Sequence, residues 1–117
     1  MAKLIIYHNP RCSKSRAAMK LIEDEGHEAE VILYLENPPS QKKLDELLKA
    51  MGREPLEAMR TKEKAFKELG LSKTDKRSRR EWIKLMVENP VLMERPIVVR
   101  GKKAVLGRPV DDVEKLL

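Results

Sequence analysis

A single cysteine stands among polar and basic residues near the start of the chain, in the segment YHNPRCSKSR at 7–16. An apolar run precedes this segment at 4–6, and apolar residues at helical spacing follow it from Ala17. Cys12 is therefore predicted to lie where a strand turns into the first turn of a helix. Free N–H groups and the helix dipole at such a position favour the thiolate, which is the nucleophile. The segment predicts a reactive thiol, and an inert buried cysteine is the alternative.

Positive charge surrounds this cysteine in the sequence. Arg11, Lys14 and Arg16 are close neighbours of Cys12, and His8 lies four residues before it. Such polar neighbours argue against burial in apolar surroundings. The N–H groups of a helix N-terminus also bind oxyanions. One loop therefore offers both a nucleophile and an anion site.

Three further arginines could complete that anion site. Arg95 and Arg108 each precede a proline, which holds the preceding residue extended and projects its side chain from a defined backbone. Arg60 lies in a helical segment. Guanidinium groups bind tetrahedral oxyanions in bidentate fashion and stay charged at any working pH. Convergence on Cys12 would create a site for arsenate or phosphate, whereas each arginine taken alone is more often a surface charge.

Length and cysteine count limit the possible classes. The 117 residues predict a single domain over 1–117 with one core. One cysteine excludes an internal disulfide, so a redox cycle needs its second thiol from another molecule. A lone thiol fits a reducing cytoplasm, and we expect a cytoplasmic monomer. The apolar run at the start is too short for a signal peptide, and no stretch reaches the length of a membrane span.

The net charge of +6 admits anionic partners, although charged residues of both signs make up 38% of the chain and mostly solubilise it. A basic cluster comprises Lys73, Lys76, Arg77, Arg79 and Arg80. Such a cluster could touch RNA or DNA but is more often a solvated helix face. Aromatic residues for base stacking are few, so nucleic acid is not an expected partner.

The periodicity predicts an α/β fold with a four-stranded mixed sheet, flanking helices and an all-helical insert. A strand at 3–7, a helix at 13–25 and a strand at 30–34 predict a parallel pair. Ser40 caps a second helix that carries Leu44, Leu47, Leu48 and Met51 and ends at Gly52.

The insert spans roughly 55–92 and is predicted to hold two or three short helices. One of them begins with a capping box at Ser78 and has an apolar face of Trp82, Leu85 and Met86. Strands at 97–99 and 104–106 then form an antiparallel hairpin through four connecting residues, and a short helix closes the chain at 110–117.

The chain resembles the glutaredoxin-dependent arsenate reductase family over nearly its whole length. The matching pieces, in order, are YHNPxC at 7–12, Ser15-Arg16, LYLENPP at 33–39, Arg60, ELGL at 68–71, Asn89-Pro90, RPIVV at 95–99 and Arg108-Pro109. The resemblance implies a thioredoxin-like fold with a helical insert and a cis Pro96 facing the cysteine loop. Because the chain ends at Leu117, it is similar to the short members of this family.

The resemblance also implies roles for individual residues. Cys12 would be the nucleophile, and His8 would help keep it ionised. The substrate-binding residues would be Arg60, Arg95 and Arg108, which bind the oxyanion, together with Ser15 and Arg16. Glutathione would be the co-substrate and glutaredoxin the partner, with no metal and no tightly bound cofactor.

One departure from the family pattern concerns the anion site. Ser13-Lys14 stands where the best-known reductases of this family carry Gly-Thr. The longer side chain could narrow the site or alter its charge.

Two other functions remain open at this point. One is a glutathione-linked thiol oxidoreductase that acts on another substrate. The other is a transcription regulator like the Spx proteins, which share the fold and bind RNA polymerase. Those regulators usually carry Cys-x-x-Cys, whereas the third residue after Cys12 here is Ser15.

Overall fold

The computed structural model describes residues 3–117, and these form two compact units. The first unit runs to Asn37 and resumes at Arg95, and the second comprises Pro38–Glu94. The predicted insert at 55–92 lies within the second unit. The single domain expected over 1–117 stays a prediction.

A four-stranded mixed sheet forms the centre of the first unit. Its strands are β1 (Leu4–His8), β2 (Ala29–Leu33), β3 (Ile97–Arg100) and β4 (Lys103–Leu106), in the spatial order β2-β1-β3-β4. β1 runs parallel to β2 and antiparallel to β3, and β3 runs antiparallel to β4. The predicted parallel pair and the predicted antiparallel hairpin are both confirmed.

The hairpin turn is tighter than the sequence suggested. Arg100 pairs with Lys103, so each strand is longer by one residue and only Gly101 and Lys102 connect them. Gly101 has a φ of 63°, a conformation that two-residue turns require and that glycine adopts without strain. The expected four-residue connection is therefore wrong, because strand pairing continues up to the glycine.

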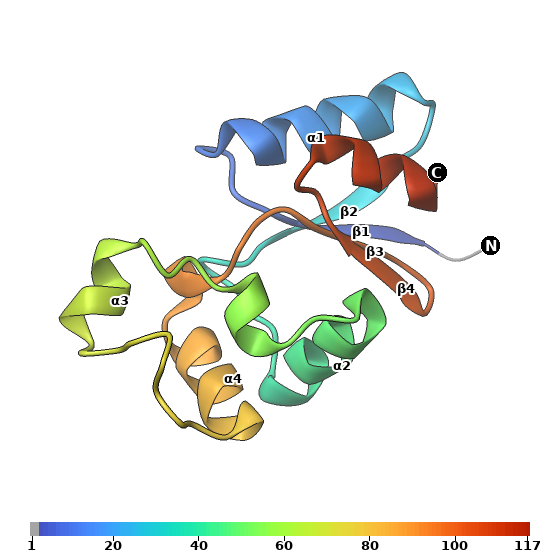
Figure 1. The fold of residues 1–117 in the computed structure, drawn as a ribbon. Helices are drawn as coiled ribbons and strands as arrows, with labels where there is room; N and C mark the ends of the chain where they lie inside the picture. Colours follow the sequence, from blue (N-terminus) through green and yellow to red (C-terminus); the bar gives the residue numbers. More distant parts are fainter. Residues whose placement is uncertain (1–2) are drawn as a thin grey trace. The chain divides into compact units, whose positions relative to one another are not determined.

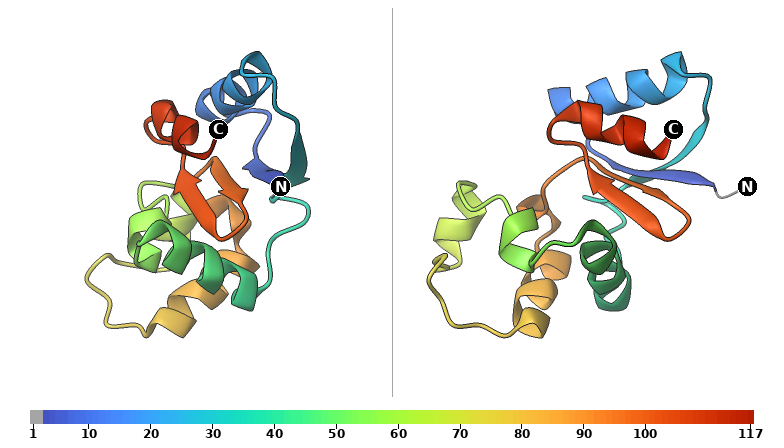
Figure 2. Two further views of the ribbon diagram at one scale, coloured as in Figure 1. Left: turned by 90° about the vertical axis from the view of Figure 1, so that its right-hand side faces the viewer. Right: turned by 45° about the vertical axis from the view of Figure 1, so that its right-hand side comes forward.

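Two helical elements pack side by side on one face of this sheet (Figures 1 and 2). They are α1 (Ser13–Asp24) and the 3-10 helix η3 (Val110–Leu116). The core between helices and sheet consists of Leu4, Ile6, Ala18, Ile22, Val98, Val113 and Leu116. Burial of this apolar surface is the main force that holds α1, and with it the cysteine loop, against the strands.

The second unit contains only helical elements. They are α2 (Gln41–Met51), the 3-10 turn η1 (Pro55–Ala58), α3 (Lys64–Glu68), α4 (Arg79–Glu88) and the 3-10 turn η2 (Pro90–Leu92). The Ser40 hydroxyl caps α2 by accepting the N–H of Lys43 at 3.0 Å. Ser78 begins α4 with the expected capping box. The caps read from the sequence are thus confirmed.

Trp82 organises the packing of this unit. Its ring stacks on Phe66 with the ring centres 6.4 Å apart, and the guanidinium of Arg77 lies 5.6 Å from its centre. On α4 the buried residues are Trp82, Ile83 and Met86, and Leu85 is half-buried. The apolar face therefore includes Ile83, which the sequence analysis left out.

The basic cluster at 73–80 is partly neutralised inside the unit. Arg77 lies 3.4 Å from Asp75, and Arg79 bridges Asp45 at 2.7 Å and Glu54 at 3.2 Å. Arg79 and then Lys49 lower the pKa of Asp45, which stays ionised. Two of the five cations therefore stabilise the unit itself, in line with a structural reading of the cluster.

No helix within residues 3–117 combines the length and the apolar character that crossing a membrane requires.

Candidate active site

The strand register brings three distant segments to one end of the sheet. Tyr7 of β1 lies opposite Ile97 of β3, and Ile97 lies opposite Leu106 of β4. The chain leaves β1 just after Tyr7, enters β3 just before Ile97 and leaves β4 at Leu106. The cysteine loop and both Arg-Pro pairs therefore lie at the same end of the sheet.

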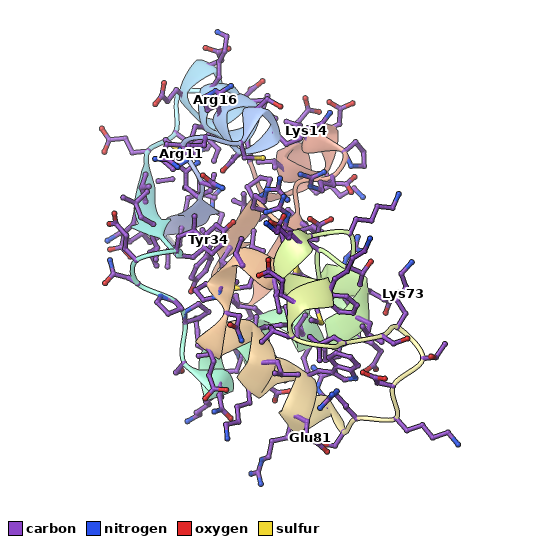
Figure 3. All side chains as sticks on the ribbon, turned by 90° about the vertical axis from the view of Figure 1, so that its left-hand side faces the viewer. Arg11, Lys14, Arg16, Tyr34, Lys73 and Glu81 are labelled. Carbon is purple, nitrogen blue, oxygen red and sulfur yellow. The ribbon has the colours of Figure 1, made fainter. Side chains whose placement is uncertain are left out.

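Asn9 shapes the loop between β1 and α1. Its side-chain oxygen accepts the N–H of Arg11 at 3.0 Å, and its carbonyl accepts the N–H of Cys12 at 3.0 Å. This is the local hydrogen bonding with which asparagine stabilises tight turns. Arg11, Lys14 and Arg16 extend from this loop and the first turn of α1 (Figure 3).

Ser15 connects this loop to His8 from a fully buried position. Its hydroxyl accepts the N–H of Asn9 at 3.0 Å and lies 2.6 Å from Nδ1 of His8. Burial and then the positive charge of Arg16 lower the pKa of His8 from its ordinary value, which favours the uncharged imidazole. The role of His8 in keeping Cys12 ionised stays a prediction.

Cys12 occupies the N-cap position of α1 and is only 7% exposed. Burial by itself raises the pKa of its thiol. The backbone N–H groups of Ser15 and Lys14 and the guanidinium of Arg95 act in the opposite direction and prevail, so the pKa lies below its ordinary value. The sequence predicted this helix N-terminus correctly. Although the residue is buried, the groups facing its sulfur are polar, as its neighbours in the sequence suggested.

Arg108 contacts the same sulfur. Its Nη2 lies 3.8 Å from Sγ of Cys12, and its Nε donates to the carbonyl of Arg95 at 2.9 Å. The peptide bonds that follow Arg95 and Arg108 are both cis, so the cis Pro96 implied by the resemblance is present and Pro109 is cis as well. Two of the predicted arginines thus converge on the thiol and contact each other.

Gly107 allows these two arginine segments to approach. Its N–H donates to the carbonyl of Pro96 at 2.9 Å. A Cβ at this position would lie 2.8 Å from Cγ of Pro96 and 3.3 Å from Cγ2 of Val113. Only glycine fits there without moving the proline ring.

The remaining predicted substrate-binding residues have other contacts in the structure. Nη1 of Arg16 donates to the carbonyl of Pro10 at 2.9 Å, which ties α1 to the loop. Arg60 belongs to the second unit, where it pairs with Glu63 at 2.9 Å. Contact of Arg16 or Arg60 with a substrate stays a prediction.

Two residues of the site had no role in the sequence analysis. Asn9 was part of a recognised motif, and an Asn-Pro pair is a turn signal that could have identified it. Gly107 left no comparable signal, because its requirement arises from contact with Pro96, which lies 11 residues earlier in the chain.

Comparisons with known proteins agree with this geometry. Residues 7–116 match the model of the ArsC family. The chain is 49% identical over 113 residues to the uncharacterised protein YfgD of Escherichia coli K12, covering 96% of this chain and 94% of YfgD. It is 40% identical over 118 residues to a Neisseria meningitidis serogroup A protein named arsenate reductase, covering all of both chains. A solved structure named arsenate reductase from Vibrio cholerae is 42% identical with a TM-score of 0.92, covering 99% of this chain and 98% of that one. The predicted family and its thioredoxin-like fold are confirmed.

Replacing Ser15 by alanine is expected to lower the free energy of unfolding by about 1–3 kcal/mol, because the N–H of Asn9 and Nδ1 of His8 lose their buried partner. Urea unfolding measures this change. Ser13→Ala removes the same atom from an exposed position of the same helix and should cost no more than about 0.5 kcal/mol. Equal losses in the two variants would contradict the assigned network.

Gly107→Ala should raise the pKa of the Cys12 thiol, because the added methyl group displaces Pro96 and with it the guanidinium of Arg95. The pH dependence of the alkylation rate reports this pKa. Val113→Ala is the matched control, since it weakens the same contact region without adding bulk. The positioning role of Gly107 is wrong if both variants, or neither, shift the thiol pKa.

Proposed function

The chain belongs to the ArsC family, and we propose that it is an arsenate reductase that uses the thiolate of Cys12 as nucleophile, with glutathione and glutaredoxin as the source of electrons. The observation that carries this proposal is the environment of the Cys12 sulfur. Cys12 carries a buried thiol whose pKa is lowered by two backbone N–H groups and a guanidinium, and a second guanidinium lies 3.8 Å away.

The first step is attack of the Cys12 thiolate on the arsenic of arsenate. A sulfur–arsenic bond forms, an arsenic–oxygen bond breaks, and the oxygen leaves as water after protonation. A nucleophilic anion and an oxyanion repel each other, so cations near the sulfur must offset that repulsion. The guanidinium groups of Arg95 and Arg108 lie near the sulfur, which supports this role for them, and they would also stabilise the charge that builds on the oxygens in the transition state. Arg60 stays a predicted third ligand of the oxyanion.

The second step reduces the arsenic. A glutathione thiolate attacks the sulfur of Cys12, the sulfur–arsenic bond breaks, and its electron pair stays on arsenic, which leaves as arsenite. Two thiolates have then become one disulfide, which balances the two electrons that arsenic gains. Glutaredoxin next attacks the glutathione sulfur and releases Cys12 as thiolate. The sequence contains only one cysteine, so both further thiols must come from other molecules.

A hollow beside the cysteine loop supports the choice of glutathione. It has a volume of about 310 Å³ and is lined by His8–Arg11 together with Leu33, Leu35 and Glu36. Arg11 and Glu36 bring charges of opposite sign to it. Glutathione carries carboxylates and an ammonium group, so a site with both signs of charge complements it. A cytoplasmic location and a monomeric state stay predictions.

A coupled assay tests the proposed function. Arsenate, glutathione, glutaredoxin and glutathione reductase are combined with the protein, and NADPH oxidation is followed. Turnover should require arsenate and all three thiol components, and Cys12→Ser should abolish it without unfolding the protein, because no other thiol is present. Turnover by the Cys12→Ser variant would contradict the assignment of Cys12 as the nucleophile. Thiol transfer by the wild-type protein that does not depend on arsenate identifies it instead as a thiol oxidoreductase for another substrate.

A further inference from the structure

Arg60 has a counter-ion within its own segment. Its Nη2 lies 2.9 Å from Oε2 of Glu63, and its Nη1 donates to the carbonyl of Val91 at 3.4 Å. The two side chains of the ion pair are only 24% and 25% exposed, so solvent screens the pair less than it screens a pair on the open surface. Both terminal nitrogens of the guanidinium are therefore engaged before any oxyanion arrives.

The backbone holds Glu63 in position to make this contact. Its N–H donates to the carbonyl of Arg60 at 3.0 Å, and its carbonyl accepts the N–H of Phe66 at 3.0 Å. Glu63 is the N-cap residue of α3, yet its side chain makes no capping hydrogen bond to that helix. The carboxylate is directed to Arg60 instead, so its loss should affect the guanidinium more than the helix.

The surroundings of Arg60 have room for an anion but little net attraction for one. A hollow of about 370 Å³ is lined by Met59, Arg60, Thr61, Lys62, Glu63 and Glu94. Its volume is many times the roughly 30 Å³ that one water molecule occupies in the liquid, so a tetrahedral oxyanion can enter. Its formal charges cancel, because two cations face two carboxylates. The carboxylate of Glu63 offsets the charge of Arg60, so an oxyanion gains the full attraction of this guanidinium when that carboxylate is displaced.

We propose that Glu63 competes with the oxyanion for Arg60 and thereby lowers the affinity of oxyanion binding. This inference rests on the proposed function, in which Arg60 binds the substrate. Displacing the carboxylate costs the same free energy for every oxyanion, because that cost depends only on the ion pair between Glu63 and Arg60. Glu63 therefore weakens the binding of all oxyanions by about the same factor.

The matched pair Glu63→Gln and Glu68→Gln tests this competition. Glu68 pairs with Lys64 at 3.6 Å on an exposed face of α3, so the control removes the same charge from the same segment without touching Arg60. In the coupled assay Glu63→Gln should lower KM for arsenate and the inhibition constant of phosphate about two- to five-fold with kcat unchanged, the range that follows from the usual strength of such pairs. Inhibition by nitrate should strengthen by a similar factor. Glu68→Gln should change none of these values.

Two further experiments distinguish failure of the Glu63 proposal from failure of the proposed function. In an Arg60→Ala background Glu63→Gln should have no effect, since the two residues act as a unit. Titration calorimetry of arsenate and phosphate into Cys12→Ser forms of the same variants measures anion affinity without turnover. Equal affinities of the Glu63 and Glu68 variants overturn the competition even where arsenate is reduced. If arsenate is not reduced but the Glu63 and Glu68 variants differ in affinity as expected, only the proposed function is overturned. If Glu63→Gln fails to fold, Glu63→Asp withdraws the carboxylate from Arg60 and should shift KM in the same direction.

Discussion

A buried sulfur anion is stable only where hydrogen-bond donors replace the water that it has lost. At Cys12 burial opposes ionisation, and the N–H groups of Ser15 and Lys14 together with Arg95 reverse that opposition. The Asn9 turn aims those N–H groups at the sulfur by fixing where α1 begins. The chemistry of the site therefore depends on the geometry of one strand-to-helix junction.

The sheet brings the two arginines to the Cys12 sulfur. Guanidinium groups from positions 95 and 108 reach a sulfur at position 12 because β3 pairs with β1 and β4 pairs with β3, so all three segments emerge at one end. The Nε of Arg108 donates to the carbonyl of Arg95, and the close contact between Gly107 and Pro96 keeps both segments in register. Strand pairing and packing thus hold the backbone of both arginine segments, and the hydrogen bond from Nε of Arg108 holds that side chain. Such preorganisation is what makes charge stabilisation effective in catalysis.

Much of this architecture could be predicted from the sequence, because strands, helices and caps have local signals. The apolar run before Cys12, the cap at Ser40 and the capping box at Ser78 each depend on neighbouring residues, and each was confirmed. Convergence of the arginines could not be derived in this way, since it depends on which strands pair. Contacts between distant residues could not be predicted either. The close approach of Gly107 to Pro96 is seen only in the folded chain.

The most direct test of this account is the pKa of the single thiol in the wild-type protein, measured from the pH dependence of thiolate absorbance and of alkylation rate. Because Cys12 is the only cysteine, the signal has one source. If the hydrogen-bond donors outweigh burial, the thiol pKa lies below the value of about 8.5 for free cysteine. A value at or above that of free cysteine would show that burial prevails, and the thiolate on which the proposed chemistry depends would not form at neutral pH.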